Sequence, residues 1–521
     1  MTETSHSHEE YLAELQKREA SARAMGGEKR IARHHAQGSL TARERIDALL
    51  DADTFDELGL LAHSDLLEAR ENTPADGKIT GYGAINGRTV FVCADDATVM
   101  AGAGGRIGYG KQMEGFKKAT KLGYPCVNLG DGGGARIPDI MGATGMMSMT
   151  YRVDGEARNR DVPQIAKIMG ACYGGPTWTA SVSDIVIQVK GAIMAVAGPA
   201  ILEVATGEKT TAEALGGWEF HAHTTGLVDI VAEDDRDCLW KVRHVLSYFP
   251  SNADLMPAVV ASKKSSSAPQ PILRDLIPTD PKAIYDMRHV LDAIADDDSV
   301  LELKPDYEGS LITALARMDG HPVGFLTNNP LVNVGAMGPG ACEKAISFIC
   351  LCDSFHIPLI FLHDTPGFFV GKFAEEHKMA QKIMAFIQAL QQSTVPRISL
   401  IVRKSYGMAH CNMVGGNMGA SILLALPFAE VSFMAPEVAV NVVYGRKLKD
   451  LPDPETAKQI MLDEMRQGNT PWEAAGLNLI DKVIDPQTIR AELIRALKRT
   501  RGADGRGGRS KRLLANWSRM F

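Results

Sequence analysis

The feature that most constrains the fold of this 521-residue chain is an internal repeat. Three pairs of landmarks share one spacing, since 320 − 87, 358 − 125 and 396 − 163 all equal 233: Gly87 with Gly320, Pro125 with Pro358, and Pro163 with Pro396. Their surroundings correspond as well, as in NGRTVFVCADD and DGHPVGFLTNN. Because this spacing far exceeds the periods of solenoid repeats, the sequence predicts two copies of one domain.

Each copy is expected to form an α/β domain, since apolar runs alternate with amphipathic stretches. Asn86-Gly87 between two such runs predicts a β-hairpin. Residues 9–50 predict an N-terminal helical arm, with Thr41 and Glu44 forming a capping box. The Ser-, Pro- and Ala-rich stretch 251–275 is typical of a linker. We therefore expect an N-terminal domain at 1–260 and a C-terminal domain at 261–521.

Composition excludes several classes of protein. A net charge of −7 gives no basic surface for nucleic acid. The polar opening MTETSHSHEE is unlike a secretory signal, and no apolar stretch is long enough to span a membrane, so we expect a cytoplasmic protein. The eight cysteines form no CxxC pair, which predicts reduced cysteines and no metal site.

Two glycine turns, one per copy, are the strongest candidates for a functional site. Gly174 and Gly175 follow an apolar run, and the repeat places them on Gly407 and Met408. Each copy also carries a glycine-rich turn one strand earlier, GDGGGARIPD at 130–139 and HDTPGFFVG at 363–371. Turns of this kind expose backbone N–H groups that can hold a negatively charged oxygen. The pattern predicts one oxyanion pocket per copy, although a tight turn without chemistry is the alternative.

Motifs along nearly the whole chain are similar to those of one family. They are GGEKRIARHHAQGSLTARERIDALLD, NLGDGGGARI, GACYGG, HDTPGF, RKSYGMAH and AAGLNLIDKVIDPQTIRAELIRAL. Together they resemble the carboxyltransferase (β) subunit of biotin-dependent acyl-CoA carboxylases, of the propionyl-CoA and methylcrotonyl-CoA carboxylase type.

The resemblance implies two tandem crotonase-like domains and a hexamer with active sites between the first half of one subunit and the second half of another. The first half would bind acyl-CoA and the second half carboxybiotin. Transfer of the carboxyl group to the α- or vinylogous carbon would pass through an enolate, without a metal. The chain shows no ATP-binding module and no biotinylation motif, so carboxybiotin is expected on a separate biotin carboxylase and carrier subunit.

The resemblance also implies roles for particular residues. The enolate oxygen would be held by Gly174 and Gly175, and the biotin oxygen by Gly407, Met408 and Ala409. Substrate-binding positions would be Gly133, Gly134, Ala135, Arg136 and Cys411. Positions against biotin would be Gly367, Phe368 and Gly371.

The sequence departs from the family pattern in three places. Met408 stands where the family has glycine, and its side chain is expected to narrow the biotin pocket. Cys411 stands where an aspartate is common, which suggests a different or larger acyl chain. The loop after Phe368 is shorter than in the family.

Three alternative functions are compatible with the same motifs. A decarboxylase subunit would run the transfer in reverse onto biotin with the same residues. A biotin-independent crotonase-type enzyme would need a placed carboxylate, and none is evident beside Gly174. The departures at Met408 and in the loop leave a non-catalytic assembly subunit as the third.

Overall fold

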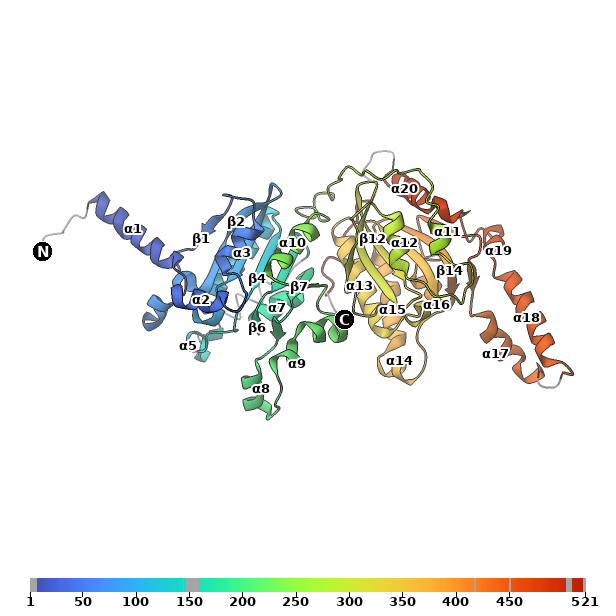
Figure 1. Cartoon of the computed structure of the whole chain (residues 1–521), viewed down its shortest axis with the longest axis horizontal. Helices are drawn as coiled ribbons and strands as arrows, with labels where there is room; N and C mark the ends of the chain where they lie inside the picture. Colours follow the sequence, from blue (N-terminus) through green and yellow to red (C-terminus); the bar gives the residue numbers. More distant parts are fainter. Residues whose placement is uncertain are drawn as a thin grey trace. The chain divides into compact units, whose positions relative to one another are not determined.

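The computed structural model describes residues 7–143, 145–146, 159–416, 418–448, 451–502 and 508–518. The chain divides into two compact units, Met1–Leu255 and Met256–Phe521 (Figure 1). This division lies close to the expected one at residue 260. The assignment of one substrate to each domain stays a prediction.

The N-terminal arm consists of three helices, α1 His8–Arg23, α2 Glu28–His35 and α3 Ala42–Leu49. The expected stretch 9–50 is interrupted because Gly27 and Gly38 adopt positive φ angles of 86° and 80°, which are incompatible with a continuing helix. The capping box at the start of α3 is confirmed. The Thr41 hydroxyl accepts from the Glu44 N–H, and the Glu44 carboxylate accepts from the Thr41 N–H at 2.7 Å.

The first unit is built on a sheet with the order β1-β2-β3-β4-β5-β7-β9. Its strands are β1 Asp56–Leu58, β2 Lys78–Ile85, β3 Arg88–Asp95, β4 Cys126–Gly130, β5 Gln164–Ile168, β7 Ile185–Val189 and β9 Ile230–Ala232. The first three strands are antiparallel and the others parallel. The predicted hairpin between β2 and β3 is confirmed, with φ of 51° at Asn86 and 74° at Gly87. A separate pair, β6 Ala171–Tyr173 with β8 Ile193–Ala195, leaves the sheet just after β5.

The second unit repeats this plan with the order β10-β11-β12-β13-β14-β15-β17. Its strands are β10 Leu301–Leu303, β11 Leu311–Met318, β12 His321–Asn328, β13 Leu359–Thr365, β14 Arg397–Tyr406, β15 Ile422–Ala425, β16 Glu430–Ser432 and β17 Lys482–Val483. Strand β16 pairs with the far end of β14. The starts of β4 and β13 differ by 359 − 126 = 233, as do those of β5 and β14 (397 − 164), so the duplication is a property of the fold.

Helices cover the two sheets. In the first unit they are α4 Arg106–Leu122, α5 Ile137–Ile140, α7 Gly175–Val182, α8 Pro199–Thr206, α9 Ala212–Gly216 and α10 Asp235–Leu246. In the second unit they are α11 Leu273–Leu276, α12 Met287–Ile294, α13 Pro339–Ser354, α14 Lys372–Glu376, α15 Met379–Gln392, α16 Gly407–Asn412, α17 Pro436–Leu448, α18 Pro454–Gly468, α19 Pro471–Gly476 and α20 Ile489–Thr500. In Figure 1, α17 and α18 form a pair that extends away from the sheet of their unit.

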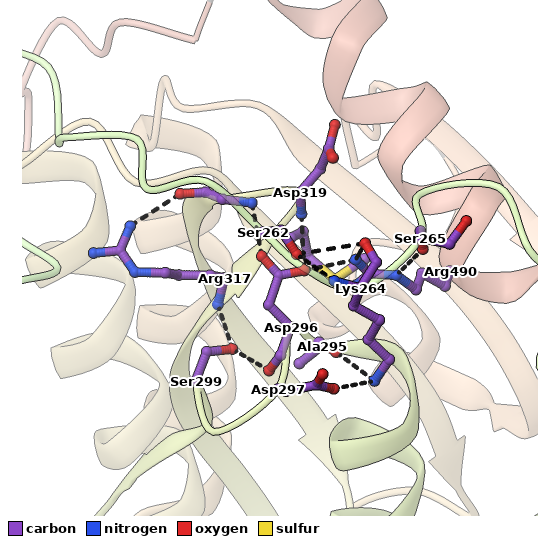
Figure 2. Close-up of polar contacts among 12 residues, drawn as sticks. Ser262, Lys264, Ser265, Ala295, Asp296, Asp297, Ser299, Arg317, Asp319 and Arg490 are labelled. Atoms are coloured by element: carbon purple, nitrogen blue, oxygen red, sulfur yellow. Dashed lines mark hydrogen bonds and ion pairs between the residues drawn. The ribbon is translucent and has the colours of Figure 1, made fainter.

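The residues expected to form a linker are attached to the second unit by a buried polar network (Figure 2). The Arg490 guanidinium, on α20, donates to the carbonyls of Ser265 at 2.9 Å and of Ile294 at 2.7 Å. It also donates to the Asp296 carboxylate at 2.6 Å, while Asp296 accepts the N–H of Gly320 at 2.7 Å. Composition therefore indicated a linker where long-range hydrogen bonds hold part of the chain against the second unit.

We predict that Arg490→Met strongly destabilises the second unit. Arg490 is 0% exposed, so its removal would leave a buried carboxylate and several carbonyls without donors. The loss should be about 3–5 kcal/mol, measured as a shift in urea denaturation. The matched control is Arg495→Met on the same helix, whose half-exposed side chain pairs with Glu492 and should contribute below about 1 kcal/mol. Equal loss in the two variants would contradict a dominant role for the network.

Candidate functional site

The first glycine turn joins β6 to α7. Gly174 has a φ of 62° and a ψ of −108°, a conformation that favours glycine, and α7 begins at Gly175. The N–H of Gly174 donates to the carbonyl of Ala195 at 3.0 Å, and the Thr177 hydroxyl donates to the same carbonyl at 2.8 Å. The expectation that Gly174 offers its N–H to an oxyanion is therefore corrected: this N–H is used by the fold, and Gly174 contributes the turn.

The preceding loop, residues 132–136, lies against this turn. The Tyr173 N–H donates to the Gly132 carbonyl at 3.3 Å, and a Cβ at Gly134 would lie 3.0 Å from the Tyr173 carbonyl oxygen. The structure thus brings the Gly133–Gly134–Ala135 segment and the Gly174–Gly175 turn together. A short parallel bridge pairs Ala135 with Gly104, which accepts the N–H of Arg136 at 2.8 Å. Because N–H directions alternate along extended backbone, the N–H of Ala135 points away from this bridge.

Arg136 is placed differently from the other members of this loop. Its side chain is 4% exposed, and its guanidinium forms ion pairs with Asp139 at 2.6 Å and with Asp76 at 2.5 Å. The guanidinium is held by two carboxylates inside the first unit, which is the geometry of a brace for the loop. These ion pairs position the loop, and the expected contact of Arg136 with substrate stays a prediction.

The second unit repeats the arrangement at the equivalent positions. Gly407 has a φ of 59°, and a Cβ there would lie 3.0 Å from the Phe433 carbonyl oxygen. A parallel bridge pairs Phe368 with Met337, just as Ala135 pairs with Gly104. Pairing of Thr365 with Ser405 brings the loop next to the turn. Gly367, at a φ of 134°, shapes that loop, and Gly371, at 111°, precedes α14.

The residues at the second turn accommodate the departures noted in the sequence. Met408 does not adopt a positive φ, so methionine is accommodated there without backbone strain. Methionine also keeps the backbone N–H that the family's glycine would have, and its side chain is 44% exposed. Ala409 is buried. Cys411 is half-buried, and burial raises the pKa of its thiol, so it is a neutral group at neutral pH.

A buried carboxylate precedes the loop of the second unit. Asp364 is 0% exposed and pairs with Arg403 at 2.7 Å and Lys404 at 3.3 Å. The Tyr285 hydroxyl donates to Asp364 at 2.8 Å, and burial together with this carboxylate raises the pKa of Tyr285 well above its usual value. Two cations and a phenol thus anchor the base of the loop.

A cavity of about 930 Å³ lies in the first unit. It adjoins loop 132–136 through Ala101, whose carbonyl accepts the Gly133 N–H at 3.0 Å, and it reaches β6 through Ala171. Its lining is mixed in charge, with three cations, Arg30, Arg33 and Lys190, and four carboxylates, Asp131, Glu233, Asp234 and Asp235. Lys190 pairs with Glu233 at 2.6 Å, so the two arginines are the cations of the lining that this ion pair leaves for a ligand.

Sequence reasoning missed a group of polar side chains beneath the second turn: Ser399, His363, Ser405 and His410, which form a chain of hydrogen bonds. Three of them lie in strands that are otherwise apolar, LIFLHDT and RISLIVRKSY. Buried parallel strands are normally continuous hydrophobic runs, so polar side chains inside them were the available signal.

In the described part of the chain, no three or more His, Cys, Asp and Glu side chains gather as a metal site would require. No described helix combines the length and the apolarity that a membrane span needs.

Comparison with known proteins decides the family. The model of the carboxyl transferase domain matches residues 33–504. The chain belongs to the carboxyl transferase domain family. The expected class, an acyl-CoA carboxyltransferase, is thereby confirmed.

Individual relatives agree with this assignment. The chain is 35% identical over 495 residues to the propionyl-CoA carboxylase carboxyltransferase subunit of Haloferax mediterranei, covering 94% of this chain and 96% of that protein. It is 34% identical over 497 residues to the methylmalonyl-CoA decarboxylase subunit alpha of Propionigenium modestum, covering 94% and 96%. A crystal structure of transcarboxylase 12S, described as a hexamer with methylmalonyl-coenzyme A and methylmalonic acid bound, superposes with a TM-score of 0.90 at 34% identity and covers 96% of each chain. The expected pair of crotonase-like domains is confirmed by this likeness.

We predict that the protein loses stability between about pH 6.5 and pH 4. Burial lowers the pKa of His321 and of His410 to about 4 and that of His363 well below its usual value. These imidazoles are neutral in the fold and take up protons on unfolding, so their contribution is complete above about pH 6.5 and is lost as the pH falls.

The check is the midpoint of urea denaturation at several values between pH 7.5 and pH 5.5, where most carboxylates stay ionised. His321→Gln removes one proton uptake and should make the decline shallower. A midpoint that does not change over this range would contradict the prediction.

Proposed function

We propose that this chain is the carboxyltransferase subunit of a biotin-dependent acyl-CoA carboxylase. It would move a carboxyl group between carboxybiotin on a separate protein and the carbon next to the thioester carbonyl of an acyl-CoA. The observation that carries the proposal is the pair of equivalent turns, Gly174 and Gly407, each with a bridge-anchored loop beside it.

The first turn suits the enolate of an acyl-CoA. When the carbon next to a thioester loses a proton, negative charge develops on the thioester oxygen. The N–H groups of Ala135 and Gly175 come from the two adjacent loops and would hold that oxygen. Each donor placed in this way typically contributes about 3–4 kcal/mol in the transition state. Gly133 and Gly134 support the proposal because only small residues let these loops lie this close together.

The second turn suits the oxygen of a ureido group. Met408 and Ala409 begin α16 and would offer backbone N–H groups, with Phe368 beside them on the loop. This set of donors fits the ureido carbonyl of carboxybiotin, which when bound supplies the carboxyl group to be transferred. Gly367 and Gly371 give the loop its shape, and the exposed Met408 side chain would limit the width of the site.

The large cavity of the first unit suits coenzyme A. Arg30 and Arg33 would face its phosphates, and the cavity adjoins the loop that carries Ala135 through Ala101. Cys411 would border the acyl group with a wall less polar than an aspartate. The identity of the acyl chain is open to a binding series of CoA thioesters.

The proposed partners would supply the functions for which this sequence shows no motif, ATP-dependent carboxylation of biotin and the biotin carrier. A biotin carboxylase and carrier subunit would supply carboxybiotin. A homohexamer is proposed by analogy with the hexamer described for transcarboxylase 12S. The cytoplasmic location is proposed from the sequence. The similarity to a methylmalonyl-CoA decarboxylase subunit favours a second candidate, in which the same residues transfer the carboxyl group from the acyl-CoA to biotin.

The decisive experiment tests whether a biotinylated protein co-purifies with this chain. The tagged protein is isolated from its source under mild conditions, and co-purifying proteins are probed with streptavidin. A biotinylated partner, together with exchange of carboxyl groups between acyl-CoA thioesters and free biotin, would support the proposal. Turnover of CoA esters without biotin would favour a crotonase-type enzyme, and failure of every CoA ester to bind would favour an assembly role.

A variant tests the first turn directly. Gly175→Pro deletes one N–H at a helix start where proline fits, so kcat should fall at least a hundredfold. Gly175→Ala is the matched control: Gly175 lies outside the left-handed region and alanine keeps the N–H, so it should stay within about tenfold of the wild type. The measurement is carboxyl exchange, with CoA binding and assembly state as folding controls. A near-normal rate in folded Gly175→Pro would overturn the role of this turn.

A further inference from the structure

A continuous chain of hydrogen bonds runs beneath the second turn. The Ser399 hydroxyl donates to the Met413 carbonyl at 3.1 Å, and the His363 Nε2 lies 2.5 Å from the Ser399 Oγ. The His363 Nδ1 lies 2.8 Å from the Ser405 Oγ, which in turn lies 2.8 Å from the His410 Nδ1. The two imidazoles meet edge to face, with ring centres 5.8 Å apart.

A bend in β14 makes this chain possible. Ser399 and Ser405 are six residues apart and would lie about 20 Å apart in a straight strand. Here both hydroxyls contact the single ring of His363. The register of β13 and β14 shifts between His363 and Thr365, where β14 leaves β15 and begins to pair with β16. The bend that shapes the second turn also closes the hydrogen-bond chain.

The carbonyl of Met413 sets the direction of every proton in the chain. A carbonyl only accepts, so the Ser399 proton points to it, and the Ser399 Oγ must accept from the His363 Nε2. A neutral His363 then accepts at Nδ1 from the Ser405 hydroxyl. The Ser405 Oγ is left to accept from the His410 Nδ1. His410 is therefore protonated at Nδ1 and carries its lone pair on Nε2.

The Nε2 of His410 remains available at the second turn. No donor among the described residues forms a hydrogen bond with it, and the ring is partly exposed while His363 is fully buried. Gly415 packs against this ring, and a Cβ there would lie within 2.5 Å of Cε1 and Nε2, so only glycine leaves the ring its place. His410 belongs to α16, three residues after Gly407. Burial lowers the pKa of His410 to about 4, so the lone pair persists at neutral pH.

We propose that His410 is a ligand-binding residue whose Nε2 accepts a hydrogen bond from an N–H group of the ligand at the second turn. Ser405 and His363 are positioning residues that fix its proton on Nδ1. The inference rests on the proposed function, in which the ligand is biotin: its ureido group offers an N–H beside the carbonyl oxygen. The turn would bind the oxygen through N–H donors, and His410 would bind the N–H.

Chemical labelling tests the open lone pair without relying on activity. Diethyl pyrocarbonate acylates neutral imidazole nitrogens, and peptide mass spectrometry locates the product. His410 should be labelled at pH 7 and His363, with both nitrogens engaged, should not. Free biotin at ten times its Kd should slow labelling of His410 about tenfold. Absence of labelling at His410, or labelling that biotin leaves unchanged, would overturn the inference.

Two variants separate ligand binding from support of the fold. The amide nitrogen of His410→Asn can replace Nδ1 toward Ser405 but leaves no acceptor at Nε2, so the KM for free biotin should rise about tenfold with kcat less affected. The amide oxygen of His410→Gln can reach the position of Nε2, and this variant should keep the KM within about threefold. A wild-type KM in His410→Asn, or equal losses in both variants, would overturn the proposal.

The carboxyl-exchange assay tests the proposed function and the role of His410 separately. Wild-type exchange between an acyl-CoA and biotin is the test of the proposed function. Absence of that exchange rejects the proposed function whatever the variants do. The difference between His410→Asn and His410→Gln in an active enzyme is the test of His410 alone.

Discussion

Each half of the chain must convert a strand into a helix within a single residue, and the rest of the site depends on how it does so. Gly174 and Gly407 adopt nearly the same positive φ, 62° and 59°, which costs glycine little and a residue with a Cβ considerably more. The turn brings the first N–H groups of α7 and α16 beside the loop of the preceding strand. A Cβ at Gly174 would meet only the Val196 carbonyl oxygen, at 3.6 Å, so the positive φ rather than crowding is what favours glycine there. The geometry of the turn is therefore a backbone property, and it survives the change from Gly175 to Met408.

The two copies differ in how they neutralise a buried carboxylate at the base of that loop. Asp131 and Asp364 are equivalent, since 364 − 131 = 233. Asp131 pairs at 2.7 Å with Arg45, which comes from the N-terminal arm. Asp364 pairs with Arg403 of its own unit, at the position where the first copy has Gly170. A Cβ on Gly170 would lie 1.9 Å from the Asp131 carboxylate, so the first copy has no room for a cation there. The arm is thus part of the first site, because it supplies the charge that the repeat itself lacks.

The repeat, the hairpin at Asn86-Gly87 and the capping box at Thr41 could be predicted because each depends on residues a short distance apart or on one constant spacing. The extent of the helical arm was predicted but its two breaks were not, since the effect of Gly27 and Gly38 on a helix depends on the φ that tertiary packing selects. Arg490 and Ser265 are 225 residues apart, and no local pattern indicates that they meet. His363 was visible as a polar residue in an apolar strand. Its partner could not be identified from the sequence, since the bend of β14 brings the two serines together.

The hydrogen-bond donors and acceptors proposed at each turn match one of the two ligands. A thioester enolate presents only an oxygen, and under the proposed function the backbone N–H groups of the first turn would bind it. A ureido group presents an oxygen and N–H groups side by side, and it is bound fully only where donors and an acceptor lie together. Beside the second turn, the direction imposed by the Met413 carbonyl places a lone pair on His410. If that carbonyl hydrogen bond were absent, the chain could reverse and His410 would present a proton instead. Under the proposal, the discrimination between the two ligands therefore depends on a single buried serine, Ser399.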